Sequence, residues 1–292
     1  MSADHGPREA GTDTRNLDTD SVPVDTAPPL GPVTCGAPEN VGTSSPTNVS
    51  EVALRIDGLE LVGKAGGSWH TTSRSAQDQP FGDWTSTSML SGKQDPTFFS
   101  IKGIEMAVVA ASPGSGLPRF LELCTFPFSC QKLTVREKSD GQEVTFDMDG
   151  ASVAVLADGT VLMAHNIGPG GSNSADVYLA TLVDAKDITK GFETEEVSAV
   201  NQPNHKEDDP ALSHDGLVLM YGAEDEIWVS ERPDLSSSFP AARKLTDVNS
   251  TSSDFGPYLA PLPPSGGKPR YELFLSSDRD GSLTVFRSEC TR

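Results

Sequence analysis

The 292-residue sequence has few aromatic residues, few basic residues and no long apolar run. Aromatic side chains make up 7% of the chain, and 42 acidic residues face only 22 lysines and arginines, so the net charge is −20. A charge of this sign repels nucleic acids and anionic membrane surfaces, which excludes both as partners. No stretch approaches the roughly 20 apolar residues of a membrane span, so we expect no transmembrane segment.

Signatures of metal sites and of activated nucleophiles are also missing. The five histidines are not paired at metal-ligand spacing, and Cys-x-x-Cys does not occur. There is no Gly-x-Ser-x-Gly elbow, and the Gly-rich stretches 114–116 and 168–172 read as turns rather than phosphate cradles. We therefore expect no cofactor and no transition metal. Weak calcium binding by the acidic stretches 205–209 and 224–226 is the one alternative, and solvated loop charge is the simpler interpretation.

The first 34 residues differ in composition from the rest of the chain. They are rich in Asp, Thr, Gly, Pro and Ser and contain no aromatic residue, which predicts a disordered acidic leader or tether over 1–34 and one folded domain over 35–292. The leader lacks the basic start and apolar core of a signal peptide. Four cysteines are compatible with two disulfides and an oxidising compartment, with free buried thiols as the alternative.

From Cys35 onward, short runs of β-favouring residues alternate with turn clusters. Examples are EVALRI, IEMAVVAA, LVLMYG and YELFLSS, and six Asp-Gly pairs supply favoured tight turns between such runs. The pattern repeats five times, with acid-led strands that begin near residues 51, 95, 151, 209 and 256. Repeats of four short strands predict a β-propeller with five blades, six being the alternative.

The last repeat contains only three clear strands, so residues 35–48 are expected to supply its outer strand and close the ring. This arrangement predicts a disulfide between Cys35 and Cys290 that clasps the ring. Cys124 and Cys130 would then form a local bridge across the hairpin between the third and fourth strands of the second blade. A bond from Cys35 to Cys124 or Cys130 would contradict this pairing.

Two copies of the repeat carry a more specific motif. DDPALSHDG contains Asp-Pro-x-x-Ser-x-Asp-Gly, and SSDRDG contains Ser-Asp-Arg-x-Gly; the matching residues are Asp209, Pro210, Ser213, Asp215, Gly216, Ser277, Asp278, Arg279 and Gly281. In these motifs the chain resembles TolB-type propeller repeats. The resemblance implies a non-enzymatic interaction or ligand-binding scaffold, exported to the periplasm or cell surface of a bacterium. It is similar to exported lipoproteins, but the residues before Cys35 lack the apolar run of a lipidation site.

Acidic residues near the starts of the inner strands form the main candidate site. Some five-bladed propellers are glycosidases that place catalytic carboxylates there, and Asp95, Asp209 and Asp254 would fill this role. Because these acids belong to the repeat, a structural role at turns is the simpler interpretation. The alternative functions are therefore a carbohydrate-active enzyme, or a relative that keeps sugar binding alone.

Residues that do not follow the repeat are candidates for binding. For Trp69 and His70, an exposed contact competes with the simpler expectation of a place in the core. We expect a monomer whose protein, small-molecule or sugar partner binds the loop face around the central channel. The candidate binding residues are Trp69, His70, Lys206, Glu207, Asp208 and His214.

Overall fold

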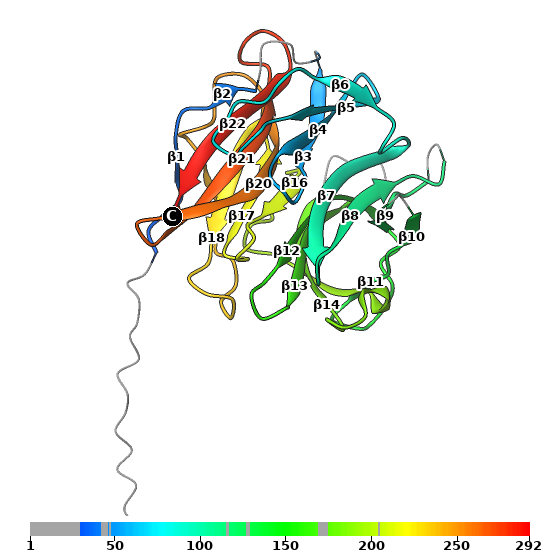
Figure 1. Ribbon diagram of the computed structural model, residues 1–292. Coiled ribbons are helices and arrows are strands. Elements are labelled where there is room, and N and C mark those ends of the chain that lie inside the picture. Colours follow the sequence, from blue (N-terminus) through cyan, green and yellow to red (C-terminus); the bar gives the residue numbers. More distant parts are fainter. Residues whose placement is uncertain are drawn as a thin grey trace, which may run out of the picture.

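The computed structural model describes residues 30–41, 46, 48–114, 117–126, 129–168, 175–203 and 205–292. These residues form five sheets arranged as blades around a central axis, and all strand pairs are antiparallel except one at the edge of the third blade (Figure 1). The predicted all-β, five-bladed propeller is thereby confirmed, and the six-bladed alternative is excluded.

In each blade the innermost strand is followed outward by its antiparallel neighbours. Blade I contains β3 (Val49–Leu54), β4 (Glu60–Ala65), β5 (Ser68–Ser73) and β6 (Thr85–Thr87), and blade II contains β7 (Lys93–Ile101), β8 (Ile104–Ala111), β9 (Phe120–Thr125) and β10 (Ser129–Lys132). Blade III contains β12 (Asp147–Val155), β13 (Val161–Gly168), β14 (Asp176–Leu182) and β15 (Phe192–Glu196), with β11 (Val135–Glu137) added in parallel at its edge. Blade IV contains β16 (Asp208–Leu212), β17 (Val218–Ala223), β18 (Glu226–Glu231) and β19 (Arg243–Lys244). Blade V contains β20 (Asp254–Ser265), β21 (Lys268–Ser277) and β22 (Thr284–Thr291), completed by β1 (Thr34–Cys35) and β2 (Glu39–Asn40).

The hydrophobic core lies between neighbouring blades rather than at the centre of the ring. Met163 and Phe192 of blade III are fully buried in a cluster that includes the apolar face of blade II. A similar cluster joins blades IV and V around Tyr271. Each sheet is therefore covered on both faces by its neighbours, which explains the fully apolar runs in the second strand of most blades.

The innermost strands share a β-bulge at their starts, and this bulge positions the candidate site. The strand register shifts at this point in blades II to V, and the extra residue has a positive φ. Glycine accepts this conformation freely, and aspartate is among the few other residues that tolerate it. The bulge residues, with φ in parentheses, are Asp95 (44°), Gly150 (55°), Asp209 (48°) and Gly256 (59°).

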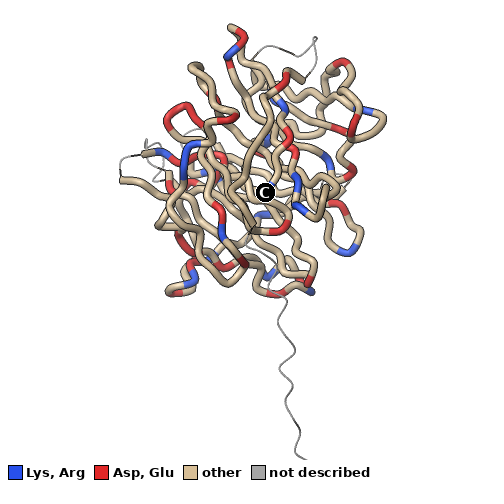
Figure 2. Tube along the Cα trace, turned by 90° about the vertical axis from the view of Figure 1, so that its left-hand side faces the viewer, with Lys and Arg blue, Asp and Glu red and all other residues tan. Residues whose placement is uncertain are grey.

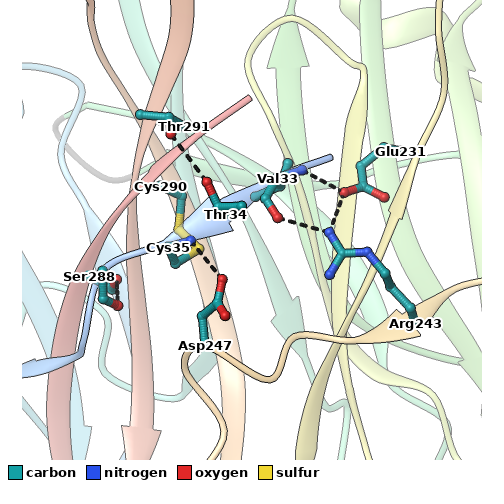
Figure 3. Close-up of a disulfide and its surroundings, with 10 residues drawn as sticks. Val33, Thr34, Cys35, Glu231, Arg243, Asp247, Ser288, Cys290 and Thr291 are labelled. Carbon is teal, nitrogen blue, oxygen red and sulfur yellow. Dashed lines mark hydrogen bonds and ion pairs between the residues drawn. A yellow bond between two sulfur atoms is a disulfide. The ribbon is translucent and has the colours of Figure 1, made fainter. Parts of the chain in front are cut away.

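The N-terminal segment closes the ring, as predicted. β1 and β2 both pair antiparallel with β22, and Cys35 lies directly opposite Cys290, to which it is disulfide-bonded (Figure 3). Cys124 and Cys130 lie opposite each other in the β9–β10 hairpin and form the second disulfide. Both predicted pairings are confirmed. Two disulfides are typical of an oxidising, extracytoplasmic environment.

The same segment also contacts blade IV. The Val33 amide donates to Glu231 Oε1 (2.9 Å), and Arg243 Nη2 donates to the Val33 carbonyl oxygen (2.8 Å) (Figure 3). The Cys35 amide donates to Asp247 Oδ2 (3.2 Å). Val33 is only 1% exposed. Of the predicted leader 1–34, residues 1–29 lie outside the described residues.

Charged residues are distributed over the whole trace. Figure 2 shows acidic and basic residues interspersed along the loops and strands, with acids in excess. Among the described residues, no helix has both the length and the apolar character needed to cross a membrane.

Candidate functional site

A small pocket lies on the propeller axis, where the innermost strands of all five blades begin. Its free volume is about 40 Å³, which holds a few water molecules. Every blade contributes residues to its wall, because the five bulged strand starts converge there. The wall includes Glu51, Asp95, Gly150, Asp209, Gly256 and Tyr258.

Three of these wall residues carry carboxylates and come from three different blades. Glu51 starts the inner strand of blade I; its Oε1 accepts a hydrogen bond from Lys64 Nζ (2.8 Å) and its Oε2 accepts one from the Asp95 amide (3.0 Å). Asp95 and Asp209 occupy the bulge positions of blades II and IV.

The pocket raises the pKa of all three acids. Burial raises the pKa of Asp95 to about 6; the charge of Asp208 adds to the rise, while Lys64 and Arg119 oppose it. Burial also raises the pKa of Asp209 well above its ordinary value, and repulsion from Asp208, Asp95 and Glu51 adds to the effect. The pKa of Glu51 is raised by burial and by Asp95, against the hydrogen bond from Lys64.

A second layer of polar residues surrounds the pocket on the side of blades III and IV. Asp208 accepts a hydrogen bond from Asn166 Nδ2 (2.8 Å) and forms an ion pair with Lys206. Arg119 donates through its backbone amide (2.7 Å) and its guanidinium to Asp147, and it also pairs with Asp149. These contacts hold two cationic side chains beside the acidic pocket.

Of the three acids expected from the sequence, the structure brings two together. Asp95 and Asp209 face the pocket, whereas Asp254 is fully buried in blade V, where it accepts hydrogen bonds from Ser250 and from Arg279. Asp254 lies two residues before Gly256, which is the residue that occupies the bulge position. The third carboxylate of the pocket belongs to Glu51. It was not among the site residues expected from the sequence, although it is the first acid of the first repeat.

The expected binding residues are dispersed. Lys206 and Asp208 lie beside the pocket, while Glu207 points inward, fully buried, with Oε1 accepting from the Gln202 amide (3.1 Å). Glu207 Oε2 has no hydrogen-bond partner among the described residues, and burial raises the pKa of this carboxyl.

The other three expected binding residues lie away from the pocket. Trp69 is 3% exposed and packs in the core between blades I and II, so it offers no exposed contact. His70 is half-buried in β5, opposite Ser86 of β6. His214 is exposed in the turn between β16 and β17, at the opposite end of the inner strand, with its ring 6.0 Å from that of Tyr271.

The described residues contain one group of three potential metal ligands, namely Glu122, Cys124 and Cys130. Both cysteines are in the disulfide of the β9–β10 hairpin and supply no thiolate. The acidic stretches 205–209 and 224–226, as far as they are described, form no such group. Weak calcium binding stays a prediction.

Comparison with known proteins gives a match in structure only. No family model and no curated protein matches the sequence. A GH43_1 enzyme from Xanthomonas citri has a TM-score of 0.59 at 11% identity, over 86% of this chain and 90% of that one. An endo-arabinase from Bacteroides thetaiotaomicron has a TM-score of 0.54 at 11% identity (87% and 96%), and the RS223 β-xylosidase has 0.53 at 10% (86% and 94%). At these identities the likeness shows the five-bladed fold.

These comparisons correct two expectations. The resemblance to TolB-type repeats is wrong, because the structures similar over most of the chain are five-bladed glycoside hydrolases. The motif was misleading because its parts have structural roles within blade IV: Asp209-Pro210 forms the bulge, and Asp215-Gly216 forms the hairpin turn. The non-enzymatic scaffold function that rested on this resemblance is contradicted as well.

Proposed function

We propose that this protein hydrolyses glycosidic bonds in pentose-containing glycans, with the central pocket as its active site. The observation that supports this most is the placement of Asp95 and Asp209. Both adopt left-handed backbone conformations at positions where two other blades carry glycine, and both present carboxyls with raised pKa values to one pocket. Strain and perturbed pKa values at the same point are typical of functional sites.

The substrate class is taken from the structural neighbours. They include arabinanases and xylosidases, and the Xanthomonas citri enzyme has also been solved in complex with xylose. A glycosidase needs one carboxyl that carries a proton and another that is ionised. We assign the proton donor to Asp209, because its pKa is raised well above the ordinary value. We assign the base to Glu51, which Lys64 holds through a charged hydrogen bond, and assign Asp95 to positioning between them.

The pocket is narrow, and this limits how a glycan could bind. A volume of about 40 Å³ admits the reacting bond and a water molecule, so the sugar rings would rest at the mouth. Among the described residues, Tyr258 is the one aromatic residue of the wall, and its hydroxyl donates to the Leu54 carbonyl oxygen (2.9 Å). These features favour a second candidate function, a relative that binds sugars without turnover.

Release of reducing sugar distinguishes the two candidates. We expect wild-type protein to release arabinose or xylose from arabinan, xylan or their 4-nitrophenyl glycosides. Asp209→Asn, Asp95→Asn and Glu51→Gln should each lower kcat/KM by at least about 100-fold while the protein stays folded. Asp158→Asn, in an exposed Asp-Gly turn, is the matched control and should keep full activity.

Two other outcomes reject the hydrolase. Saturable binding of arabinan or xylan oligosaccharides without turnover would support the sugar-binding relative. Absence of both binding and turnover, in a wild-type protein shown to be folded, would reject both candidates.

A further inference from the structure

Arg74 of blade I and Arg232 of blade IV occupy the same place in two blades. Each follows the third strand of its blade, and its Nε donates to the carbonyl oxygen of the glycine 16 residues earlier, at 2.8 Å in both cases. Each guanidinium also lies over a phenylalanine ring, with 4.5 Å between Arg74 and Phe81 and 4.6 Å between Arg232 and Phe239. The repeat therefore builds the same buried guanidinium site twice.

The two sites differ in what occupies the outer edge of the guanidinium. Arg74 Nη1 and Nη2 both donate to the carboxylate of Glu272 in the neighbouring blade V, each at 2.7 Å. The strand register places Leu162 of blade III at the equivalent position, because Leu162 pairs with Ala154 as Glu272 pairs with Ala260. The neighbouring blade thus gives Arg232 a leucine where Arg74 receives a carboxylate.

Arg232 is consequently a buried cation whose hydrogen bonds go to main-chain carbonyl oxygens. It is 5% exposed, and its Nη1 reaches only the carbonyl oxygens of Leu235 and Ser237, both at 3.4 Å. Its Nε donates to the Gly216 carbonyl oxygen, so these hydrogen bonds all go to the main chain. A buried guanidinium without a carboxylate is unfavourable, and a planar anion would satisfy it in a bidentate manner.

Arg232 also lines a pocket large enough for a small ligand. The pocket, of about 240 Å³, lies between blades III and IV at the end of β16 opposite to the central acids. Of the acidic wall residues, Glu195 pairs with Lys138 (2.9 Å) and Glu196 accepts from Asn201 (3.3 Å). The charges of Asp234 and Asp215 also act on Arg232; Asp234 accepts from the Ser236 and Ser237 amides, and Asp215 accepts from Ser213 and Tyr271. Apolar and hydroxyl groups complete the wall, from Leu179, Val197, Ser198, Ser236, Ser238 and Phe239.

We infer that this pocket binds a sugar acid, whose carboxylate pairs with the guanidinium of Arg232 from the pocket side, as the carboxylate of Glu272 pairs with Arg74. The serine hydroxyls on the wall suit the hydroxyl groups of such a ligand. That the ligand carries a carboxylate follows from Arg232 alone. That it is a sugar rests on the proposed function.

Titration calorimetry on the full chain with three probes tests the assignment. Glucuronate should bind, glucose should not, and acetate should bind at least tenfold more weakly than glucuronate. No binding of glucuronate, or binding of glucose with equal affinity, would overturn the site. Equal affinities for acetate and glucuronate would overturn the assignment to a sugar acid.

Variants of the pocket locate the binding. Leu162→Glu supplies the internal carboxylate found in blade I and should abolish glucuronate binding, whereas the matched Leu162→Met should retain it. Arg232→Lys keeps the charge but loses the bidentate geometry, and should weaken binding at least tenfold even if Leu162→Glu does not fold. Asp209→Asn should bind glucuronate like the wild type, which separates this site from the proposed active site. Unchanged binding in Arg232→Lys would contradict the inference.

Discussion

At the residue scale, a few residues of the central pocket combine an unfavourable backbone conformation with a buried carboxyl. Left-handed φ values are unfavourable by about 1–2 kcal/mol for residues with a Cβ, and aspartate only reduces this cost. Gly150 and Gly256 show that the fold itself does not need a side chain at this position. Asp95 and Asp209 therefore add strain and mutual repulsion that the architecture alone does not require.

The raised pKa values predict how stability varies with pH. Because Asp95 has a pKa of about 6 in the folded protein and about 4 when unfolded, the folded state binds more protons between these values. The carboxyl therefore favours folding at low pH, and this contribution is lost as the pH rises through about 6. Asp95→Asn removes the effect, so its stability relative to wild type should increase between pH 4 and pH 8, by on the order of 2–3 kcal/mol.

Urea unfolding at both pH values measures this difference. Asp158→Asn is the control: the pKa of Asp158 is lowered by the Thr160 amide, so its stability relative to wild type should change slightly in the opposite direction. A constant difference between Asp95→Asn and wild type across this range would show that Asp95 is not perturbed in the folded protein.

At the element scale, the sequence predicted the strands well and the position of one site residue poorly. The alternation of β-favouring runs with turn clusters, and the Asp-Gly pairs in those turns, are local signals, so they located every blade. Asp254 was aligned with Asp209 because both are acids near the start of an inner strand. In blades IV and V the bulge residue directly precedes proline, in Asp209-Pro210 and Gly256-Pro257, so alignment of these two repeats on proline would have placed it correctly.

The two disulfides should differ in their contribution to stability. Cys35 and Cys290 are 255 residues apart, whereas Cys124 and Cys130 are 6 apart. In the chain-entropy model, the longer loop gives the first bond an advantage of about 3 kcal/mol. The double variant Cys35→Ser/Cys290→Ser should therefore lose more unfolding free energy than the double variant Cys124→Ser/Cys130→Ser. Guanidinium unfolding of both variants measures the difference. Equal losses would mean that the pairing of β1 and β2 with β22 closes the ring without the disulfide.

At the scale of the whole molecule, closure of the ring depends on contacts between distant parts of the sequence. The count of strands in the last repeat was enough to predict that the N-terminal segment completes blade V. The buried charges across the blade interfaces were not predictable, because nothing local marks them. Arg74 and Glu272 are 198 residues apart and meet only once blades I and V pack together.

This ion pair provides a test of how much the closed ring depends on a single buried contact. Glu272 is fully buried and accepts two hydrogen bonds from Arg74 of blade I and one from Arg287 of its own blade. Glu272→Gln leaves the Arg74 charge buried without a carboxylate, so we expect a loss of about 3–5 kcal/mol in unfolding free energy. Glu289→Gln is the matched control, because Glu289 binds Arg270 and Arg287 at the surface, where such pairs contribute about 0–1 kcal/mol. Similar losses in the two variants, measured by urea unfolding, would show that the blade I–V interface closes without this ion pair.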